Sequence, residues 1–172
     1  MRRRILSIFT LPMMLAGIIM ATAPAALADS PHFVGASASV SGTNLVVSFH
    51  EAGLGTNEQV HFVANADATA TLVCVNKGGA NPSASNKTQV TGPVTAEGTF
   101  SSGKNGNINQ SLTLSPPPAP STFMCPKGQS KQTAQVSYTN VSVTDTTNNI
   151  PEPIPGTFST GCLLPDVRGA CT

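Results

Sequence analysis

Apolar and polar residues alternate along most of this chain with a period of two. From Phe33 onward, Val, Leu, Ala and Phe residues take turns with Ser, Thr, Asn and Gln, and no convincing stretch follows the 3.6-residue spacing of a helix. A period of two places apolar side chains on one face of an extended strand and polar side chains on the other. The pattern therefore predicts an all-β fold of half-buried antiparallel strands.

Turn-forming residues divide this pattern into about seven strands. The inward-facing residues are expected, strand by strand, at Val34, Ala36, Ala38 and Val40; Leu45, Val47 and Phe49; Val60, Phe62 and Ala64; Ala70, Leu72 and Cys74; Val90, Val94, Ala96 and Phe100; Ile108, Leu112 and Leu114; and Ala134, Val136 and Tyr138. Ser41-Gly42 predicts a hairpin between the first two strands. Asn105-Gly106 predicts another between the fifth and the sixth.

The last long strand changes the parity of its apolar residues. Between about Thr133 and Thr144 these residues first stand at even positions, up to Tyr138, and then at odd positions, from Val141. A strand cannot bury both sets on one face without an extra residue. We therefore expect a β-bulge or an edge crossing near Thr139-Asn140.

The start of the chain has the order of a secretory signal peptide. Arg2-Arg3-Arg4 is followed by an apolar stretch from Ile5 to about Ala26, and then by the small-x-small sequence Ala26-Leu27-Ala28. We expect residues 1–28 to be removed and the protein to be secreted into the extracellular space. No later apolar segment approaches the roughly 20 residues that span a bilayer, so no membrane span is expected.

All four cysteines follow the predicted signal peptide, and an even number in an oxidising compartment implies two disulfides. Three pairings are possible for Cys74, Cys125, Cys162 and Cys171. We favour Cys74 with Cys125 and Cys162 with Cys171, because the second pair closes a short segment that contains a turn-forming Pro-Asp. The close Cys-x-x-Cys spacing of many zinc sites is absent.

About seven strands and two core-facing cysteines about fifty residues apart predict a disulfide-braced antiparallel β-sandwich with immunoglobulin-like topology. The chain has no Trp, whereas a true immunoglobulin domain carries one in its core. We expect the sandwich to occupy residues 29–147. Residues 148–172, a Pro-rich tail with the small disulfide loop, are expected to pack on its outside.

Two strings of the sequence resemble a group of small secreted proteins from actinomycete bacteria. They are Ser48-Phe49-His50-Glu51-Ala52-Gly53-Leu54-Gly55 and Cys74-Val75-Asn76-Lys77-Gly78-Gly79-Ala80-Asn81-Pro82. The resemblance implies export and compact folding. It implies no activity and no functional residues.

Three histidines and one glutamate are candidate metal ligands. Pairing of the second strand with the third would place His50 opposite or diagonal to His61, and the first hairpin would bring His32 close to Glu51. Neutral imidazole suits zinc and copper(II). The alternative is that exposed strand positions simply tolerate histidine, since no HxH or HExxH motif is present. We expect no cofactor, with zinc or copper as the alternative.

The charged residues are few and scattered. Without the three arginines of the signal peptide, six basic residues face eight acidic ones, with no run of like sign. This composition leaves no basic patch for nucleic acid and argues against an electrostatically steered partner.

Other activities lack their usual residues. No Gly-x-Ser-x-Gly motif presents a serine nucleophile, and the carboxylates are isolated along the chain. Tyr138 is the one polar aromatic residue, and only Phe123 and Phe158 are left over from the predicted core to stack on sugars, so glycan binding is not expected.

These exclusions favour a non-catalytic secreted module that presents loops to a protein or cell-surface partner. The longest internal loop runs from Lys77 to Asn86, and we take Lys77, Asn81 and Asn86 as candidate contact residues. A histidine-based metal-binding domain is the alternative function, and a hydrolase of unknown type is the third.

Overall fold

The computed structural model describes residues 30–76, 78 and 86–171, and its regular elements are β-strands. The predicted signal peptide lies outside these residues. The strands are β1 (His32–Ser41), β2 (Asn44–Ala52), β3 (Gln59–Asn76), β4 (Lys87–Ser101), β5 (Ile108–Leu114), β6 (Gln129–Asp145), β7 (Ile150–Ile154) and β8 (Phe158–Ser159). Within the described ranges, no helix is long and apolar enough to cross a membrane.

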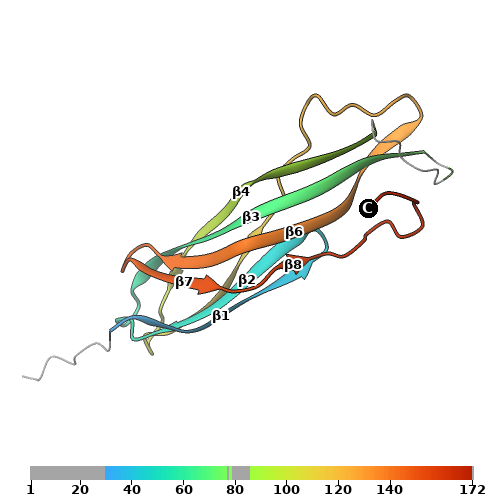
Figure 1. Cartoon of the computed structure of the whole chain (residues 1–172). Coiled ribbons are helices and arrows are strands. Elements are labelled where there is room, and N and C mark those ends of the chain that lie inside the picture. The colour runs from blue at the N-terminus through green and yellow to red at the C-terminus, as the bar shows by residue number, and fades with distance from the viewer. Residues whose placement is uncertain (1–29, 77, 79–85, 172) are drawn as a thin grey trace, which may run out of the picture.

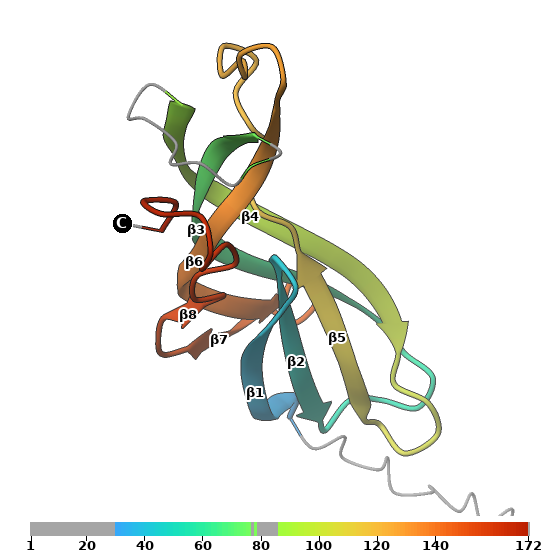
Figure 2. The same cartoon turned by 90° about the vertical axis from the view of Figure 1, so that its right-hand side faces the viewer.

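The strands form two antiparallel sheets that pack face to face (Figures 1 and 2). The smaller sheet has the order β1-β2-β5. The larger has the order β4-β3-β6-β7, and β8 also pairs with β6. The predicted all-β fold with two antiparallel sheets is therefore confirmed.

Inward-facing residues of both sheets form one apolar core. Phenylalanines are its bulkiest apolar members: Phe49 of β2 and Phe62 of β3 meet across the sheets with ring centroids 4.5 Å apart. Phe33 and Phe100 pack around them, at 6.1 to 6.3 Å from these two rings. Contacts of this kind contribute beyond the burial of their apolar area.

A buried tyrosine ties the two sheets together at one end of this core. Tyr138 of β6 is fully buried, and its hydroxyl donates a hydrogen bond of 2.6 Å to the carbonyl oxygen of Thr43, in the turn between β1 and β2. Burial raises the pKa of Tyr138 to about 12, so the phenol stays a hydrogen-bond donor over the physiological range. This turn marks where the smaller sheet ends.

Three strands of the larger sheet continue beyond that turn. We call this extension the arm: Leu72–Asn76 of β3, Lys87–Val90 of β4 and Gln129–Ala134 of β6, with the segments 115–128 and 160–171 that cover it. Figure 1 shows the three strands projecting past the ends of β1 and β2, and Figure 2 shows a covering segment on each side.

Each face of the arm has its own small core and its own disulfide. On one face, Leu72, Cys74 and Phe123 are buried together, and Cys74 is bonded to Cys125. On the other face, residues of β3 and β6 pack against the C-terminal segment, which the Cys162–Cys171 disulfide closes. Both predicted disulfides are confirmed, and both brace the arm.

The predicted bulge in the last long strand is also confirmed. Asn65 pairs with Ser142 but Asp67 pairs with Thr139, so β6 has one more residue here than β3. The extra residue lies at Asn140, whose φ of 51° is in the left-handed region that Asn tolerates. This bulge turns Tyr138 and Val141 to the same core.

Two predictions about strand connections are wrong. The third and fourth predicted strands are one continuous strand, β3, because Ala66 and Ala68 are also buried and continue the same alternation. The Asn105-Gly106 turn does not close a hairpin, since it leads from β4 in the larger sheet to β5 in the smaller one. The positive φ of Gly106 permits a tight turn, but it does not determine that the strands before and after the turn pair with each other.

Val34 is not an inward residue, as its alternation suggested. The pairing of β1 with β2 shifts between Phe33 and Gly35, which leaves Val34 as the extra residue of a bulge. Its side chain is 57% exposed, and Phe33 packs against the core in its place. The first hairpin itself is confirmed, with Ser41 paired to Asn44.

The C-terminal segment continues the larger sheet before it reaches the arm. Strand β7 pairs with the end of β6, and Ser159 of β8 pairs with Ser137. The backbone N–H of Thr160 then donates to the carbonyl oxygen of Val136, and that of Leu163 donates to the carbonyl oxygen of Ala134. These bonds lead the chain along β6 onto one face of the arm.

We predict that Tyr138→Phe lowers the free energy of unfolding by about 1 kcal/mol, because it removes the bond to Thr43 without opening a cavity. Urea unfolding of the disulfide-intact protein measures this value. Phe158→Leu, at a half-buried position of β8, is the control for a change that removes no hydrogen bond. An unchanged midpoint for Tyr138→Phe would show that the cross-sheet bond contributes nothing.

Candidate functional site

The predicted metal ligands do not come together. Their convergence required β2 to pair with β3, but these strands belong to different sheets. His50 pairs with Gly35 and Asn109 in the smaller sheet, whereas His61 pairs with Thr99 in the larger one. The predicted pairing of His50 with His61 is therefore wrong.

The other two predicted ligands, His32 and Glu51, lie in surroundings that differ from each other. His32 is exposed and pairs with Ala52, and its Nδ1 lies 2.9 Å from the carbonyl oxygen of Ser30. Glu51 faces the core and is fully buried. Across the described part of the chain, no three His, Cys, Asp or Glu side chains form a group that could hold a metal ion.

His61 takes part in a surface network instead. Its Nδ1 lies 2.8 Å from Oγ1 of Thr146, and its Nε2 lies 3.9 Å from a carboxylate oxygen of Glu97 on β4. The backbone N–H of His61 donates to Oγ1 of Thr147. These contacts hold the turn between β6 and β7 against β3.

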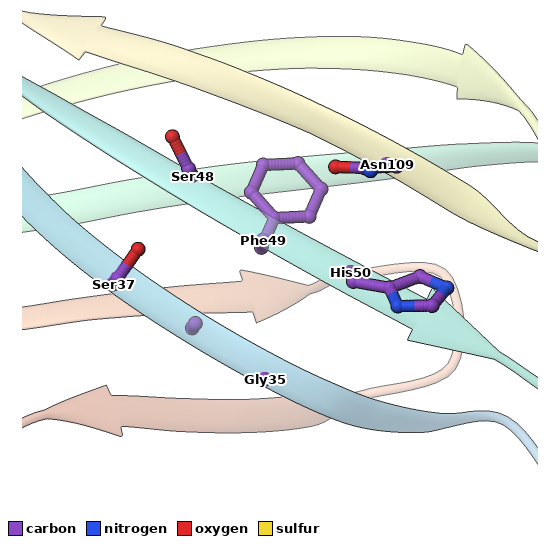
Figure 3. Close-up of a pocket in the computed structure, with 7 residues that line it drawn as sticks. Gly35, Ser37, Ser48, Phe49, His50 and Asn109 are labelled. Atoms are coloured by element: carbon purple, nitrogen blue, oxygen red, sulfur yellow. The ribbon is translucent and has the colours of Figure 1, made fainter.

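His50 lies at a shallow hollow of about 320 Å³ on the outer surface of the smaller sheet. Figure 3 shows its ring on β2 between Gly35 of β1 and Asn109 of β5, with Ser37 and Ser48 further along the same strands. Gly35 leaves open space beside the ring, since a Cβ there would meet no atom within 4 Å.

Polar side chains line this hollow together with Ala36 and Phe49. Hydroxyls, an amide and one imidazole line it, and none of the described lining residues is a carboxylate that would orient the imidazole as a base. A wide, shallow surface of this kind also excludes little water. The hollow therefore offers hydrogen bonds to a ligand on the outer surface of the smaller sheet.

The most unusual chemical group in the described structure is a buried pair of carboxyls. Glu51 of β2 and Asp145 of β6 are both fully buried, one from each sheet. Neither oxygen of the Glu51 carboxyl has a hydrogen-bond donor among the described residues. The backbone N–H groups of Thr147 and Asn148 donate to Oδ1 of Asp145, at 2.8 and 3.0 Å, and the Asn148 side chain donates to Oδ2 at 2.6 Å.

The two carboxyls differ in their hydrogen-bond partners. Asp145 accepts hydrogen bonds from three N–H groups of the turn that follows it. Burial, then the charge of Asp145 and a hydrogen bond to it, raise the pKa of Glu51 from 4.5 to about 8. A neutral Glu51 has a proton to donate to Asp145, while its other oxygen still lacks a donor among the described residues.

The arm carries most of the exposed large apolar side chains. Met124, on the covering segment 115–128, is 78% exposed, and Leu163, on the C-terminal segment, is 38% exposed. Val34, which is 57% exposed, lies in the bulge of β1. Two apolar side chains thus stand on the two covers of a rigid, disulfide-braced projection.

The predicted interaction loop begins and ends at the tip of this arm. It joins Asn76 of β3 to Lys87 of β4, and Asn86 at its end donates a hydrogen bond of 3.3 Å from Nδ2 to Oε1 of Gln129 on β6. Lys77 and Asn81 lie outside the described residues. The sequence predicts this loop from its Gly and Pro residues, but it does not predict the arm from which the loop extends.

Sequence reasoning also missed Asp145 and Met124. Asp145 is followed by Thr-Thr-Asn, a sequence in which an aspartate can accept N–H bonds from the turn after it, and this signal was available. No sequence signal indicated that Asp145 lies close to Glu51 of the opposite sheet, since the two residues are far apart in the sequence. Met124, beside a cysteine and a buried phenylalanine, has no sequence signal for exposure.

No protein-family model, curated protein or solved structure matches this chain. The resemblance to small secreted actinomycete proteins therefore remains a prediction from two sequence strings. What the protein does must be inferred from the geometry of its own residues.

We predict that the protein loses stability as the pH rises from about 5 to about 8. The pKa of Glu51 is raised in the folded state, so its stabilising contribution is complete below the ordinary value of 4.5 and is lost as the pH rises toward 8. The slope reaches about 1.4 kcal/mol per pH unit for one proton. Urea unfolding at a series of pH values measures it.

Glu51→Gln tests the origin of this slope. The amide keeps the size of the side chain and still donates to Asp145, but it does not titrate, so the slope should flatten. Glu58→Gln, at an exposed position, is the matched control and should keep the slope of the unaltered protein. A slope that persists in Glu51→Gln would assign the pH dependence to other groups.

Proposed function

We propose that this protein is a secreted, non-catalytic recognition module whose arm contacts a protein or a cell surface. The observation that carries the proposal is the position of the two disulfides. Both lie in the arm, where each closes a cover on one face, whereas the core between the sheets holds together without a covalent bond. Two disulfides are consistent with an extracellular protein.

The arm has the physical character of a recognition element. Three strands and two covers form small cores on both of its faces, so the backbone of the arm is braced before any partner binds. Preorganisation of this kind reduces the entropy cost of association. Exposed Met124 and Leu163 supply apolar contacts on two sides of the arm.

The two ends of the loop between Asn76 and Lys87 lie at the tip of the arm. These ends are fixed by the two strands, and Asn86 is bonded to Gln129. We propose that Lys77, Asn81 and Asn86 contribute to the same contact surface, since rigid scaffolds commonly carry recognition on such loops.

An immunoglobulin-like arrangement of the sandwich is part of the proposal. The orders β1-β2-β5 and β4-β3-β6-β7 support it, because strands one, two and five of that fold share a sheet, as do strands three, six and seven. Here β4 pairs with β3 and so extends the sheet that contains β3. In variable-type domains the additional strands extend the same sheet. The Cys74–Cys125 disulfide departs from that pattern, since it braces the arm instead of joining the two sheets.

We predict that labelled mature protein binds to intact cells of the species that secretes it, and that the arm carries this binding. Met124→Glu combined with Leu163→Glu should lower the bound fraction about fivefold or more, because charged side chains replace the apolar contacts. Both positions are exposed, so the fold should be kept. Flow cytometry measures binding, and circular dichroism with intact mass checks the fold and the disulfides.

Val34→Glu is the matched control, because it places the same charge on an exposed apolar position outside the arm. It should bind like the unaltered protein. Equal binding by the unaltered protein, the Met124→Glu and Leu163→Glu double variant and Val34→Glu would place the contact surface outside these positions. An unaltered protein that does not bind would count against the cell surface as the partner.

A further inference from the structure

The fold gathers cations that are scattered along the sequence. Among the described Lys and Arg residues, four of five lie on the arm: Lys87, Lys127, Lys131 and Arg168. The strand pairing explains this, since Lys87 pairs with Val73 and Lys131 pairs with Cys74, at the same end of β3. The fifth, Lys104, lies between β4 and β5, in a loop at the opposite end of the molecule.

The acidic residues have the opposite distribution. Six of the seven in the described ranges lie off the arm: Glu51, Glu58, Asp67, Glu97, Asp145 and Glu152. Asp166, in the C-terminal segment, is the acidic residue described on the arm. The arm is therefore basic and the sandwich acidic, although the mature chain as a whole is close to neutral.

The cations of the arm lie on both of its faces. The Nζ of Lys87 donates a hydrogen bond of 3.0 Å to the carbonyl oxygen of Gly169, on the face that the C-terminal segment covers. The Nζ of Lys131 lies 5.4 Å from the centre of the Phe123 ring, on the opposite face. Lys127 and Arg168 are exposed on the two covers. Positive charge thus surrounds the arm.

This arrangement determines what kind of partner fits. A flat, rigid surface would reach the cations of one face only, and a single surface ion pair contributes little. A flexible chain with repeated negative charges can reach several of these cations at once and releases counterions as it binds. Repulsion from the acidic sandwich would keep such a chain on the arm.

We propose that the arm binds a flexible anionic polymer at the cell surface, one that carries repeated phosphate or carboxylate groups. This inference rests on the proposed function and names the chemistry of the partner. It predicts salt-sensitive binding, whereas the apolar contacts of Met124 and Leu163 depend little on salt.

The test uses purified mature protein and defined polymers. Linear polyphosphate and poly-glutamate are titrated into labelled protein and followed by fluorescence anisotropy, so that phosphate and carboxylate are distinguished. With three to four cations engaged, binding should weaken about 20- to 50-fold when NaCl is raised from about 50 to about 200 mM. A neutral dextran of similar length should not bind.

Charge reversal locates the binding surface. Lys127→Glu combined with Arg168→Glu should abolish polymer binding, and it leaves intact the Lys87 and Lys131 contacts that hold the covers. Lys104→Glu is the matched control, since it reverses one cation at the opposite end, and it should bind like the unaltered protein. Circular dichroism verifies that all three proteins are folded.

Three results would overturn the inference: no binding of either polymer at low salt, binding that salt does not weaken, or equal loss in Lys104→Glu and the double variant. Binding to phosphatidylglycerol vesicles without binding to the polymers would also overturn it, in favour of a membrane. Cell binding that is insensitive to salt and to the double reversal would refute the polymer and leave the recognition function standing.

Discussion

The pairing of β3 with β6 is the interaction on which the rest of this structure depends. It runs from Phe62 with Asp145 at one end to Asn76 with Gln129 at the other, with two shifts of register between them. The first part of this ladder supplies the larger sheet with its inward face, and the second part forms the arm. The larger sheet of the sandwich and the strands of the arm are therefore one continuous sheet.

Apolar packing and two polar contacts attach the smaller sheet to this ladder. The phenylalanines of the core fill the space between the sheets, and the Tyr138 hydroxyl ties β6 to the turn after β1. At the other end, Glu51 faces Asp145, which is held by the turn after β6. The two polar contacts need a partner from the opposite sheet, so they specify how the sheets face each other as well as stabilise them.

The arm and the sandwich also differ in charge and in covalent bracing. Both disulfides and most of the described cations lie on the arm. The disulfides lie where the sheet has lost its opposite sheet and two thin covers replace it. Small cores of this size bury little apolar area, and a covalent bond compensates by restricting the unfolded chain. The same covers carry two of the three exposed large apolar residues in the described ranges, Met124 and Leu163, and two of the five described cations, Lys127 and Arg168. The proposed recognition surface and the disulfides that brace it thus belong to the same segments.

The amino-acid sequence by itself determined the class of fold and its local features. Alternation with a period of two predicts strands whatever their partners, the parity change after Tyr138 predicts the bulge at Asn140, and the short spacing between Cys162 and Cys171 favours the pairing that is found. Each of these depends on residues close together in the chain.

Only the tertiary structure decided which strands share a sheet, and with them the candidate sites. The predicted metal site does not form because β2 and β3 lie in different sheets. Glu51 lies close to Asp145 because the two sheets pack face to face, and Lys87 and Lys131 come to the same end of the larger sheet because β4 and β6 both pair with β3. Strand partners depend on the packing of whole faces against one another, a non-local interaction that no short pattern of residues encodes.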